Sequence, residues 1–432
     1  MGLASCLVYA VDMSLEQAIK ESALGIGFDL IGVAPLEVGQ DLDFARHWVE
    51  QGRGGEMNYL RDPKRHDPRQ VLPSARSVVC AGLVYNSPLP YSTEVHTFPK
   101  QLSPEGAAPS QDFQSPAECP GGILSQPPVQ TGWISRYAWG RDYHKVMKGK
   151  LEALRTAMQR LAPGVETRVY VDTGPMVERA FARFSGIGWM GKNTCLINQE
   201  KGSWFFLGVI LTNLVLRPDL PAFDRCGSCR RCIEACPTGA LDQPYAMDAS
   251  RCIAYFTIEL KGSIPLEFRP AMGVNVFGCD ICQDVCPWNA PRDDPEAIHK
   301  DPEVARHPRP LKRLGRGAAQ TTIPEFHPRR VRAGTHESTS AEEFSLFNPP
   351  LAALASMTEE EFRLNFKNSP MQRAKFQGFI RNACIALGNS RNRDLLPAIK
   401  PWAVHQNPVI REHAQWALAQ IEKSNPPADR GI

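Results

Sequence analysis

A cysteine-rich stretch between Cys226 and Cys286 constrains the fold of this chain more strongly than any other part of its sequence. It holds eight of the 13 cysteines in a chain of 432 residues. The first half follows the pattern C-x2-C-x2-C-x3-C-P, and the second half ends in C-x2-C-x3-C-P after an additional cysteine, Cys252. The first pattern is that of bacterial ferredoxins, in which the last cysteine binds the partner cluster. The stretch therefore predicts two [4Fe–4S] clusters.

The ferredoxin rule also divides the eight cysteines into two ligand sets, because each cysteine before a proline serves the other cluster. The sets are Cys226, Cys229, Cys232 with Cys286, and Cys252, Cys279, Cys282 with Cys236. Zinc sites usually combine two CxxC pairs or mix Cys with His, so they fit this pattern less well. Disulfides need an oxidising compartment, and residues 1–11 lack the basic start of a signal peptide. We therefore expect reduced thiols that bind clusters.

The length of the chain predicts several domains, because 432 residues exceed one typical hydrophobic core. We expect a mixed α+β and α/β multi-domain fold. Its predicted parts are an N-terminal α/β cofactor-binding domain (14–220), a ferredoxin-like two-cluster domain (221–290), a basic proline-rich linker (291–355) and an α-helical HEAT-like region (356–424).

Local patterns predict the elements of the first domain. Short apolar runs predict strands at 28–34, 77–85 and 167–171, and a strand pair or hairpin within 203–216. Capping signals and helical periodicity predict helices at 14–24, 41–51, 145–161 and 176–185. Cys80, inside an apolar run, is expected in the core. Residues 86–132 are rich in Pro, Ser, Gly and Gln, so they predict a flexible insertion in which His96 and Cys119 are incidental.

The last third of the chain is basic in two places. Residues 306–332 hold eight Lys or Arg and one acid, which fits either a solvated linker or a surface that contacts phosphates. Further on, segments 382–387 and 413–418 match at a spacing of 31, a weak helical repeat whose core should contain Cys384. The repeat region carries Arg373, Lys375, Arg381, Arg391, Arg393 and Lys400. This charge favours a polyanionic partner, although the net charge of +3 alone would not indicate one.

Asp172 is the acid that sequence position singles out, since it follows the strand at 167–171, where α/β folds place ligands. An N-cap of the next helix is the structural alternative. Glycines around Trp189 would let the backbone approach a planar ligand, and Tyr59 and Arg61 stand in a loop that suits a ligand mouth. The D-x-H motif that ends at His144 lacks the final glycine of a cobalamin-binding motif, so His144 is expected to be structural.

Several motifs in order, together with the cysteines, resemble the epoxyqueuosine reductase family. They are RYAWGRDYH at 136–144, VDTGP at 171–175, GWMGKNT at 188–194 and GSWFFLG at 202–208. The resemblance implies a cobalamin-dependent enzyme with two [4Fe–4S] clusters that reduces epoxyqueuosine to queuosine at wobble position 34 of tRNAs with a GUN-type anticodon. It implies Asp172 as the proton donor, with a pKa raised by burial. The implied cobalamin contacts are Ser135, Arg136, Asp172, Asn193, Thr194 and Leu196.

Two other classes of protein remain open on the sequence. One is a reductive dehalogenase, a related corrinoid iron–sulfur enzyme for small halogenated molecules, and the other is an electron-transfer module without catalysis. A basic helical tail favours the tRNA enzyme over both. No apolar run approaches the length of a bilayer, so we expect no membrane association. Reduced thiols indicate a cytoplasmic location. We further expect a low-potential electron donor and a monomeric state.

Overall fold

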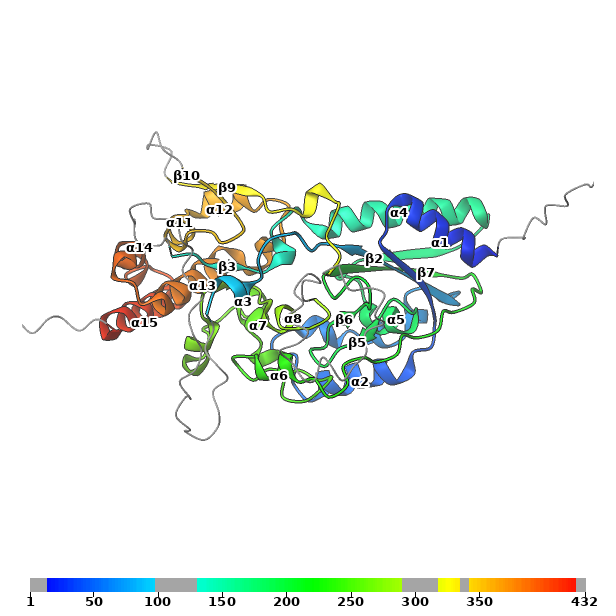
Figure 1. Cartoon of the computed structure of the whole chain (residues 1–432), viewed down its shortest axis with the longest axis horizontal. Helices are drawn as coiled ribbons and strands as arrows, with labels where there is room; N and C mark the ends of the chain where they lie inside the picture. Colours follow the sequence, from blue (N-terminus) through cyan, green and yellow to red (C-terminus); the bar gives the residue numbers. More distant parts are fainter. Residues whose placement is uncertain (1–13, 98–129, 290–317, 335–341, 425–432) are drawn as a thin grey trace, which may run out of the picture.

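The computed structural model describes residues 14–97, 130–289, 318–334 and 342–424. Its N-terminal half is built on one four-stranded sheet with helices on both faces, and its C-terminal end is helical (Figure 1). The cysteine-rich stretch lies between these two parts. The predicted mixture of helix and sheet in several domains is confirmed. None of the helices in the described ranges is both long enough and apolar enough to cross a bilayer.

The sheet has the strand order β1-β2-β7-β4, and every neighbouring pair is antiparallel. Its strands are β1 (Leu30–Pro35), β2 (Ser77–Val84), β7 (Phe205–Thr212) and β4 (Thr167–Tyr170). The prediction of an α/β domain is therefore wrong in strand direction, and the sheet is of the α+β kind. The expected strand pair at 203–216 is likewise wrong, because β7 crosses the sheet as a single strand.

Helices on both sides explain why the central strands are apolar throughout. α1 (Leu15–Ile26) and α4 (Tyr143–Leu161) cover one face, and α2 (Gly39–Glu50) and α5 (Glu178–Phe184) cover the other (Figure 1). Alternate residues of β2 point to opposite faces, so Val79 packs with the first pair of helices and Cys80 with the second. Every residue of β2 is buried. Cys80 is thus a core residue, as predicted.

Short elements surround the cysteine-rich stretch. They are α3 (Ser92–Val95), β3 (Trp133–Ile134), β5 (Trp189–Met190), β6 (Leu196–Ile197), α6 (Arg231–Glu234), α7 (Ile253–Ile258), β8 (Asn275–Phe277) and α8 (Ile281–Asp284). β3 and β8 form a parallel pair, and β5 and β6 form an antiparallel one. Through the β3–β8 pair, the stretch is anchored to a segment that lies more than 100 residues earlier in the sequence.

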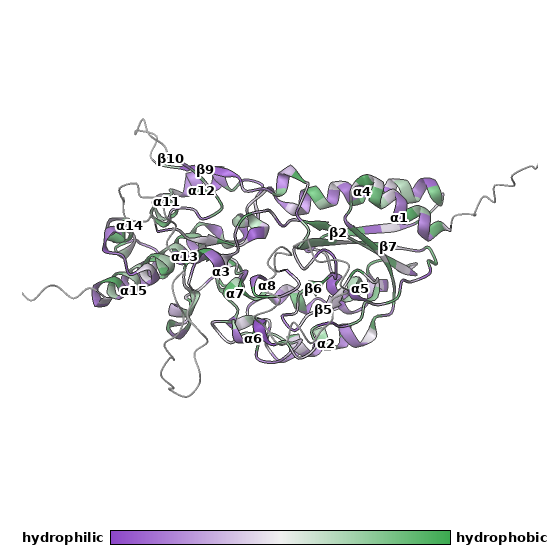
Figure 2. Cartoon of the chain, in the orientation of Figure 1, coloured by the Kyte–Doolittle hydropathy of each residue, from purple (hydrophilic) through white to green (hydrophobic). Residues whose placement is uncertain are grey.

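The C-terminal part shares one core with β3 and β8. Its elements are β9 (Arg330–Ala333), β10 (Glu342–Ser345), α11 (Leu351–Ser356), α12 (Glu359–Asn365), α13 (Lys375–Ser390), α14 (Leu396–Ala403) and α15 (Pro408–Ser424). Figure 2 shows the apolar stripes of these helices beside polar ones. Thr358 caps α12 in a capping box with Glu361, and Cys384 is fully buried, as expected for a core position.

Two segments that the sequence predicted to be loose are partly ordered. Within 86–132, residues 86–97 pack against the protein: the Ser92 amide donates to Asp284 at 2.9 Å, and His96 lies 3.0 Å from the side chain of Asn348. Cys119 falls outside the described residues. Within 291–355, β9 pairs with β10 and α11 enters the C-terminal core, because their apolar side chains cover that core.

Arg381 is a correction to the predicted basic surface, since its side chain is fully buried in α13. It donates to the carbonyl oxygens of Phe256, Leu260 and Gly262, the last two at 2.8 and 2.6 Å. The guanidinium therefore ties α13 to the end of α7 instead of facing a polyanion.

We expect Arg381→Met to destabilise the fold by about 3 kcal/mol, because methionine fills the space but leaves these carbonyl groups without donors. The midpoint of thermal unfolding, followed by circular dichroism, should fall, while exposed Lys400→Met should leave it unchanged. An unchanged midpoint for Arg381→Met would contradict this structural role.

Candidate active site

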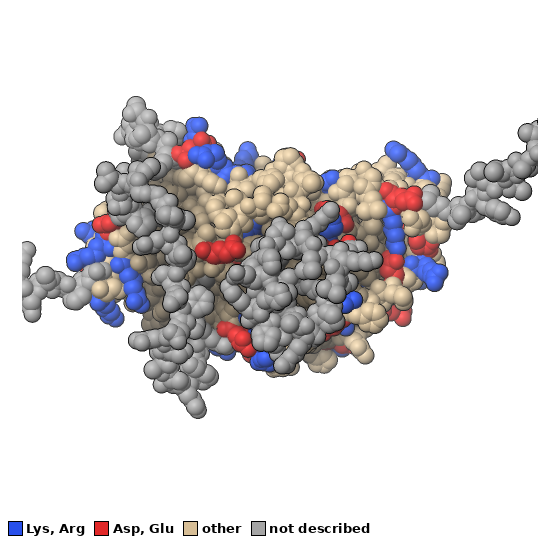
Figure 3. Space-filling model, viewed as in Figure 1, with Lys and Arg blue, Asp and Glu red and all other residues tan. Residues whose placement is uncertain are grey.

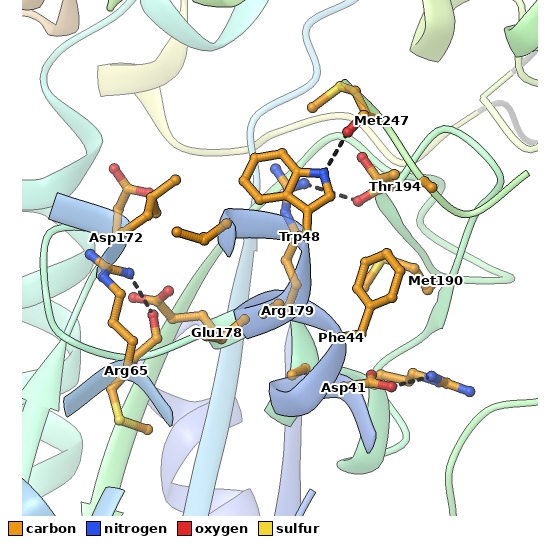
Figure 4. Close-up of a pocket in the computed structure, with 18 of the residues that line it drawn as sticks. Asp41, Phe44, Trp48, Arg65, Asp172, Glu178, Arg179, Met190, Thr194 and Met247 are labelled. Carbon is orange, nitrogen blue, oxygen red and sulfur yellow. Dashed lines mark hydrogen bonds and ion pairs between the residues drawn. The ribbon is translucent and has the colours of Figure 1, made fainter. Parts of the chain in front are cut away.

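A cavity of about 1190 Å³ opens between the sheet, the cysteine-rich stretch and the start of the C-terminal helices. Figure 4 shows 18 of its lining residues. Side chains from distant parts of the chain meet there, among them Trp48, Tyr59, Tyr143, Asp172, Glu178, Trp189, Thr194, Met247 and Arg373. Tyr59 therefore lines the cavity as predicted, whereas Arg61 is absent from the wall and Arg65 takes part in it.

Asp172 stands at the edge of this cavity, just after β4. Its backbone has a φ of 55°, in the left-handed region that few residues other than glycine adopt. Thr194, on the facing turn, has a φ of 61°. Arg179 Nη1 joins the two segments by donating to the Thr194 carbonyl at 2.9 Å. Strained residues of this kind cluster at functional sites, and here two of them face one cavity.

Two neighbouring side chains at the start of α4 hold the carboxylate of Asp172. The hydroxyl of Tyr143 donates to Asp172 Oδ2 at 3.0 Å, and His144 Nε2 lies 3.3 Å from the same oxygen. The other ring nitrogen of His144, Nδ1, lies 2.7 Å from Asp142 Oδ1. Tyr143 is itself fixed by stacking on Phe206 of β7, with ring centroids 4.2 Å apart. The imidazole of His144 thus lies between two carboxylates.

The contacts between these side chains determine the charges of His144 and Asp172. Burial disfavours the charged imidazole, but its contacts with Asp142 and Asp172 prevail and raise the pKa of His144 to about 9. Burial would raise the pKa of Asp172, yet His144 and Tyr143 lower it below its usual value. The prediction of a raised Asp172 pKa is therefore wrong in this structure. These shifts favour a protonated His144 beside an ionised Asp172 at neutral pH, and a structural role of His144 would include holding that carboxylate.

The glycines around Trp189 serve the protein itself. A side chain at Gly188 would come within 2.3 Å of the Ile197 carbonyl oxygen, and one at Gly191 within 2.6 Å of the Ile197 side chain. Both glycines therefore permit the tight β5–β6 hairpin, and the predicted close approach to a planar ligand is not their evident role. Trp189 does line the cavity, where it makes an edge contact with Trp288.

The residues predicted to contact cobalamin divide into two groups. Asp172 and Thr194 line the cavity, whereas the side chains of the other four do not. Ser135 bonds Asp280, the Asn193 side chain donates to the Cys282 carbonyl at 3.1 Å, and Leu196 is a core residue. Arg136 is buried and donates to the carbonyls of residues 87, 89 and 90. Side-chain contacts from these four to a ligand in the cavity are not supported.

Electrostatic interactions among the cysteine side chains agree with the predicted ligand sets. Cys286 interacts electrostatically with Cys226, Cys229 and Cys232. Cys279 interacts in the same way with Cys252 and Cys236, and Cys282 with Cys279 and Cys252. Cys282 also interacts with Cys195, so the crossed assignment of each cysteine before a proline stays a prediction.

The thiols also have the chemistry that a cluster needs. All eight are free, and burial raises the pKa of Cys252 to about 11 and that of Cys232 to about 12, with further contributions from neighbouring cysteines. Within the described ranges no three acidic, His or Cys side chains converge on a single metal ion. That is expected if the sulfurs surround a cluster, and cationic iron would favour the thiolates that crowding disfavours.

The turn at 191–195 connects the two cysteine groups with the cavity. Lys192 Nζ donates to the carbonyls of Gly227 and Cys229 in the first group, at 2.5 and 2.9 Å. Asn193 bonds the backbone of Cys282 in the second group, and Thr194 lines the cavity. A single turn thus links the backbone of Cys282, which the cysteine pattern assigns to the second cluster, with the wall of the cavity.

Comparison with known proteins agrees with this geometry. Residues 225–289 match the 4Fe-4S double cluster binding domain, and residues 65–173 match the family described as epoxyqueuosine reductase QueG, DUF1730. An epoxyqueuosine reductase of Pseudomonas aeruginosa is 35% identical over 409 residues, covering 94% of each chain. The chain belongs to the epoxyqueuosine reductase family.

Solved structures of this family have the same fold. A crystal structure of an epoxyqueuosine reductase with a tRNA-Tyr epoxyqueuosine-modified stem loop has a TM-score of 0.69 and 28% identity, covering 94% of this chain and 90% of that one. The Bacillus subtilis enzyme, with the same score, identity and coverage, was captured with an aspartate-bearing catalytic loop swung out of its active site. The family acts as oxidoreductases in tRNA modification and uses cobalamin with two [4Fe–4S] clusters.

Sequence reasoning missed three residues of the site. His144 and Tyr143 were visible in the RYAWGRDYH motif, but nothing local showed that they meet Asp172, 28 or more residues later. Glu178 carried no signal besides its position six residues after Asp172 in the segment that follows VDTGP.

Proposed function

We propose that this chain reduces epoxyqueuosine to queuosine at the wobble position of tRNA, in the cavity beside Asp172. The observation that carries the proposal is the cluster of Asp172, Tyr143 and His144 at a cavity whose opposite turn contacts the cluster cysteines. The removal of an oxygen atom requires both protons and electrons. Asp172 with His144 would supply the protons to this cavity, and the clusters would supply the electrons.

The cavity suits cobalamin. Its volume exceeds the roughly 300–1,000 Å³ of most small-molecule sites, and tryptophan and tyrosine side chains form much of its wall. Asp172 and Thr194 are among the lining residues that would hold cobalamin, which would supply a strongly reducing metal centre when bound. No histidine is needed from the incomplete D-x-H motif, because His144 is already held between Asp142 and Asp172.

Asp172 would donate a proton in the reaction, and its neighbours would return one to it. The epoxide oxygen leaves as water, and a positioned acid lowers the barrier by protonating it. Asp172 and His144 share one proton across 3.3 Å, so the pair delivers it from Asp172 and recovers it through the imidazole. Asp142 keeps the ring oriented at its other nitrogen.

A turnover experiment tests the proposed function. The protein, with clusters and cobalamin loaded, is mixed anaerobically with a strong reductant and tRNA that carries epoxyqueuosine, and the nucleoside at position 34 is weighed. The loss of one oxygen atom, dependent on cobalamin, is expected. An unchanged nucleoside from loaded protein would overturn the proposal and favour a small-molecule substrate, as for a dehalogenase.

We further propose that the helices after residue 356 form a HEAT-like region that binds the tRNA. Figure 3 shows Lys and Arg side chains at the end of the molecule formed by α14 and α15. Exposed members of this basic end are Arg391, Arg393 and Lys400. Arg373, from the segment before α13, reaches the cavity wall and pairs with Glu259 at 3.0 Å. The same region thus offers a phosphate-binding surface and part of the wall.

We expect Arg393→Ala with Lys400→Ala to weaken tRNA binding and to reduce its salt dependence, with the logarithmic slope falling by roughly 0.7–0.9 for each phosphate that is no longer neutralised. Turnover at saturating tRNA should persist, because neither side chain lines the cavity. Binding is measured by filter retention across salt concentrations. The matched control replaces Arg155 and Arg160, at the far end of α4, and an equal effect of both pairs would refute a specific basic surface.

The reaction consumes electrons, so a low-potential electron donor must reduce the clusters. We propose that the chain acts as a monomer in the cytoplasm, where its tRNA substrate is found.

A further inference from the structure

The stoichiometry of the proposed reaction demands more protons than Asp172 and His144 share. Conversion of an epoxide to an alkene and water consumes two electrons and two protons. Two C–O bonds break, a C=C bond forms, and both protons end on the departing oxygen. The electrons come from the external reductant through the clusters. Since Asp172 and His144 hold one proton between them, the second has to reach Asp172 from outside this pair, from a further group or from solvent.

Most other acids on the cavity wall are committed to partners. Asp41 pairs with Arg183 at 2.7 Å, and Glu259 pairs with Arg373. Asp224 accepts from the hydroxyl of Tyr245 at 2.5 Å. The carboxyl group of each of these residues is therefore already bonded to a donor.

Glu178 differs from these acids. It is the first residue of α5 and lines the cavity, yet its Oε1 atom is buried with no hydrogen-bond partner. Figure 4 shows it grouped with Asp172 and Arg65 on one side of the cavity. The guanidinium of Arg65 is engaged elsewhere, because it donates to the carbonyls of Met176 and Tyr59, both at 3.2 Å. A buried carboxyl without a paired cation favours its protonated form.

The groups around Glu178 have opposing effects on its pKa, and the rise prevails. Burial is the largest influence and raises its pKa to about 7, and the negative charge of Asp172 adds to the rise. Backbone amides of Asp172 and of Glu178 itself, together with the charge of Arg65, oppose it. The thiol of Cys80, on β2, interacts electrostatically with the same carboxyl and stays neutral, because burial raises its pKa to about 12. His66, on the same cavity, likewise has a buried ring nitrogen, Nδ1, without a partner.

We propose that Glu178 holds the second proton of the reaction and passes it to Asp172 after Asp172 has protonated the epoxide oxygen once. Glu178 then becomes the carboxylate and is reprotonated from solvent between turnovers. Because it acts through Asp172, Glu178 is a positioning residue for the proton and does not contact the substrate. This inference rests on the proposed function and deepens it.

Glu178→Gln tests the inference, because glutamine keeps an acceptor oxygen for the Asp172 amide but carries no acidic proton. In wild type, turnover of epoxyqueuosine tRNA should fall as the pH rises through about 7, where Glu178 loses its proton. The variant should be slower at pH 6 on the order of 10- to 100-fold, lack this fall, and keep the KM for tRNA. Glu166→Gln, exposed at the other end of β4, is the control and should follow wild type.

A second measurement does not depend on activity. Infrared difference spectra of cofactor-free wild type should show a protonated carboxyl band that loses intensity between pH 6 and 8. Glu178→Gln should lack this component and keep only the band of Asp284, whose pKa burial raises to about 8. A wild-type enzyme that turns over but shows no such component, or a variant with the wild-type pH profile, would overturn the role of Glu178 and leave the proposed function intact. A loaded wild type that leaves epoxyqueuosine unchanged would instead overturn the proposed function.

Discussion

Asp172→Asn should lower turnover of epoxyqueuosine tRNA by roughly 10²- to 10⁴-fold, the usual contribution of a positioned general acid. Asparagine has the same shape and tolerates the left-handed backbone at this position, where φ is 55°. The loop should therefore keep its place, and the binding of tRNA and cobalamin should persist. Single-turnover mass analysis of the nucleoside measures the rate, and filter retention measures tRNA binding.

The pKa of His144, which contacts Asp172, provides a second test that needs no bound cofactor. The pKa of His144 is raised to about 9 despite burial, because Asp142 and Asp172 both contact its ring. Removal of one carboxylate should lower that pKa, which a titration of the imidazole by NMR detects. An Asp172→Asn enzyme that turns over like wild type would exclude Asp172 as the acid, and an unchanged His144 pKa would exclude the contact between them.

The same pair makes a stability prediction with a definite sign. The folded-state pKa of His144 lies above its ordinary value of 6.5, so protonated His144 stabilises the folded protein fully below pH 6.5. That contribution is lost as the pH rises through about 9. Asp172→Asn should weaken the contribution, so the unfolding midpoint of the variant should depend less on pH between 6.5 and 9 than that of wild type.

The sequence predicted those features that local patterns determine. Ser14 and Thr358 begin helices because each caps its first turn, and both caps are present. Cys80 and Cys384 stand in apolar runs and are buried. The cysteine spacing likewise sufficed to predict a double cluster binding domain, because ligand spacing is encoded over a few residues.

Features that depend on long-range packing were not predictable from such patterns. β2 and β7 are apolar on both faces, which is common in parallel sheets, and only the helices on both sides explain it in an antiparallel one. A string of positive charges did not distinguish buried Arg381 from its exposed neighbours. The pKa of Asp172 depends on His144, and that of Glu178 on burial, so neither charge state followed from the motif.

Replacement of a cluster ligand should also strongly reduce turnover, since loss of either cluster would interrupt electron transfer to the cavity. We expect Cys286→Ala to abolish turnover and to lose about half of the iron, because it removes a ligand of one cluster only. Cys80→Ala, in a buried position outside the two groups, should keep both clusters and full turnover. Iron content and EPR spectra of the reduced protein provide the measurement.

Double variants test the crossed pairing of the two runs. Cys286 lies with Cys226 although 60 residues separate them, whereas Cys236 lies with the second group although it follows Cys226 by ten. Cys226→Ala combined with Cys286→Ala should therefore lose no more iron than either change alone. Cys226→Ala combined with Cys236→Ala should lose both clusters. The reverse result would mean that each run binds its own cluster, and Cys236 would then not be a ligand of the second cluster.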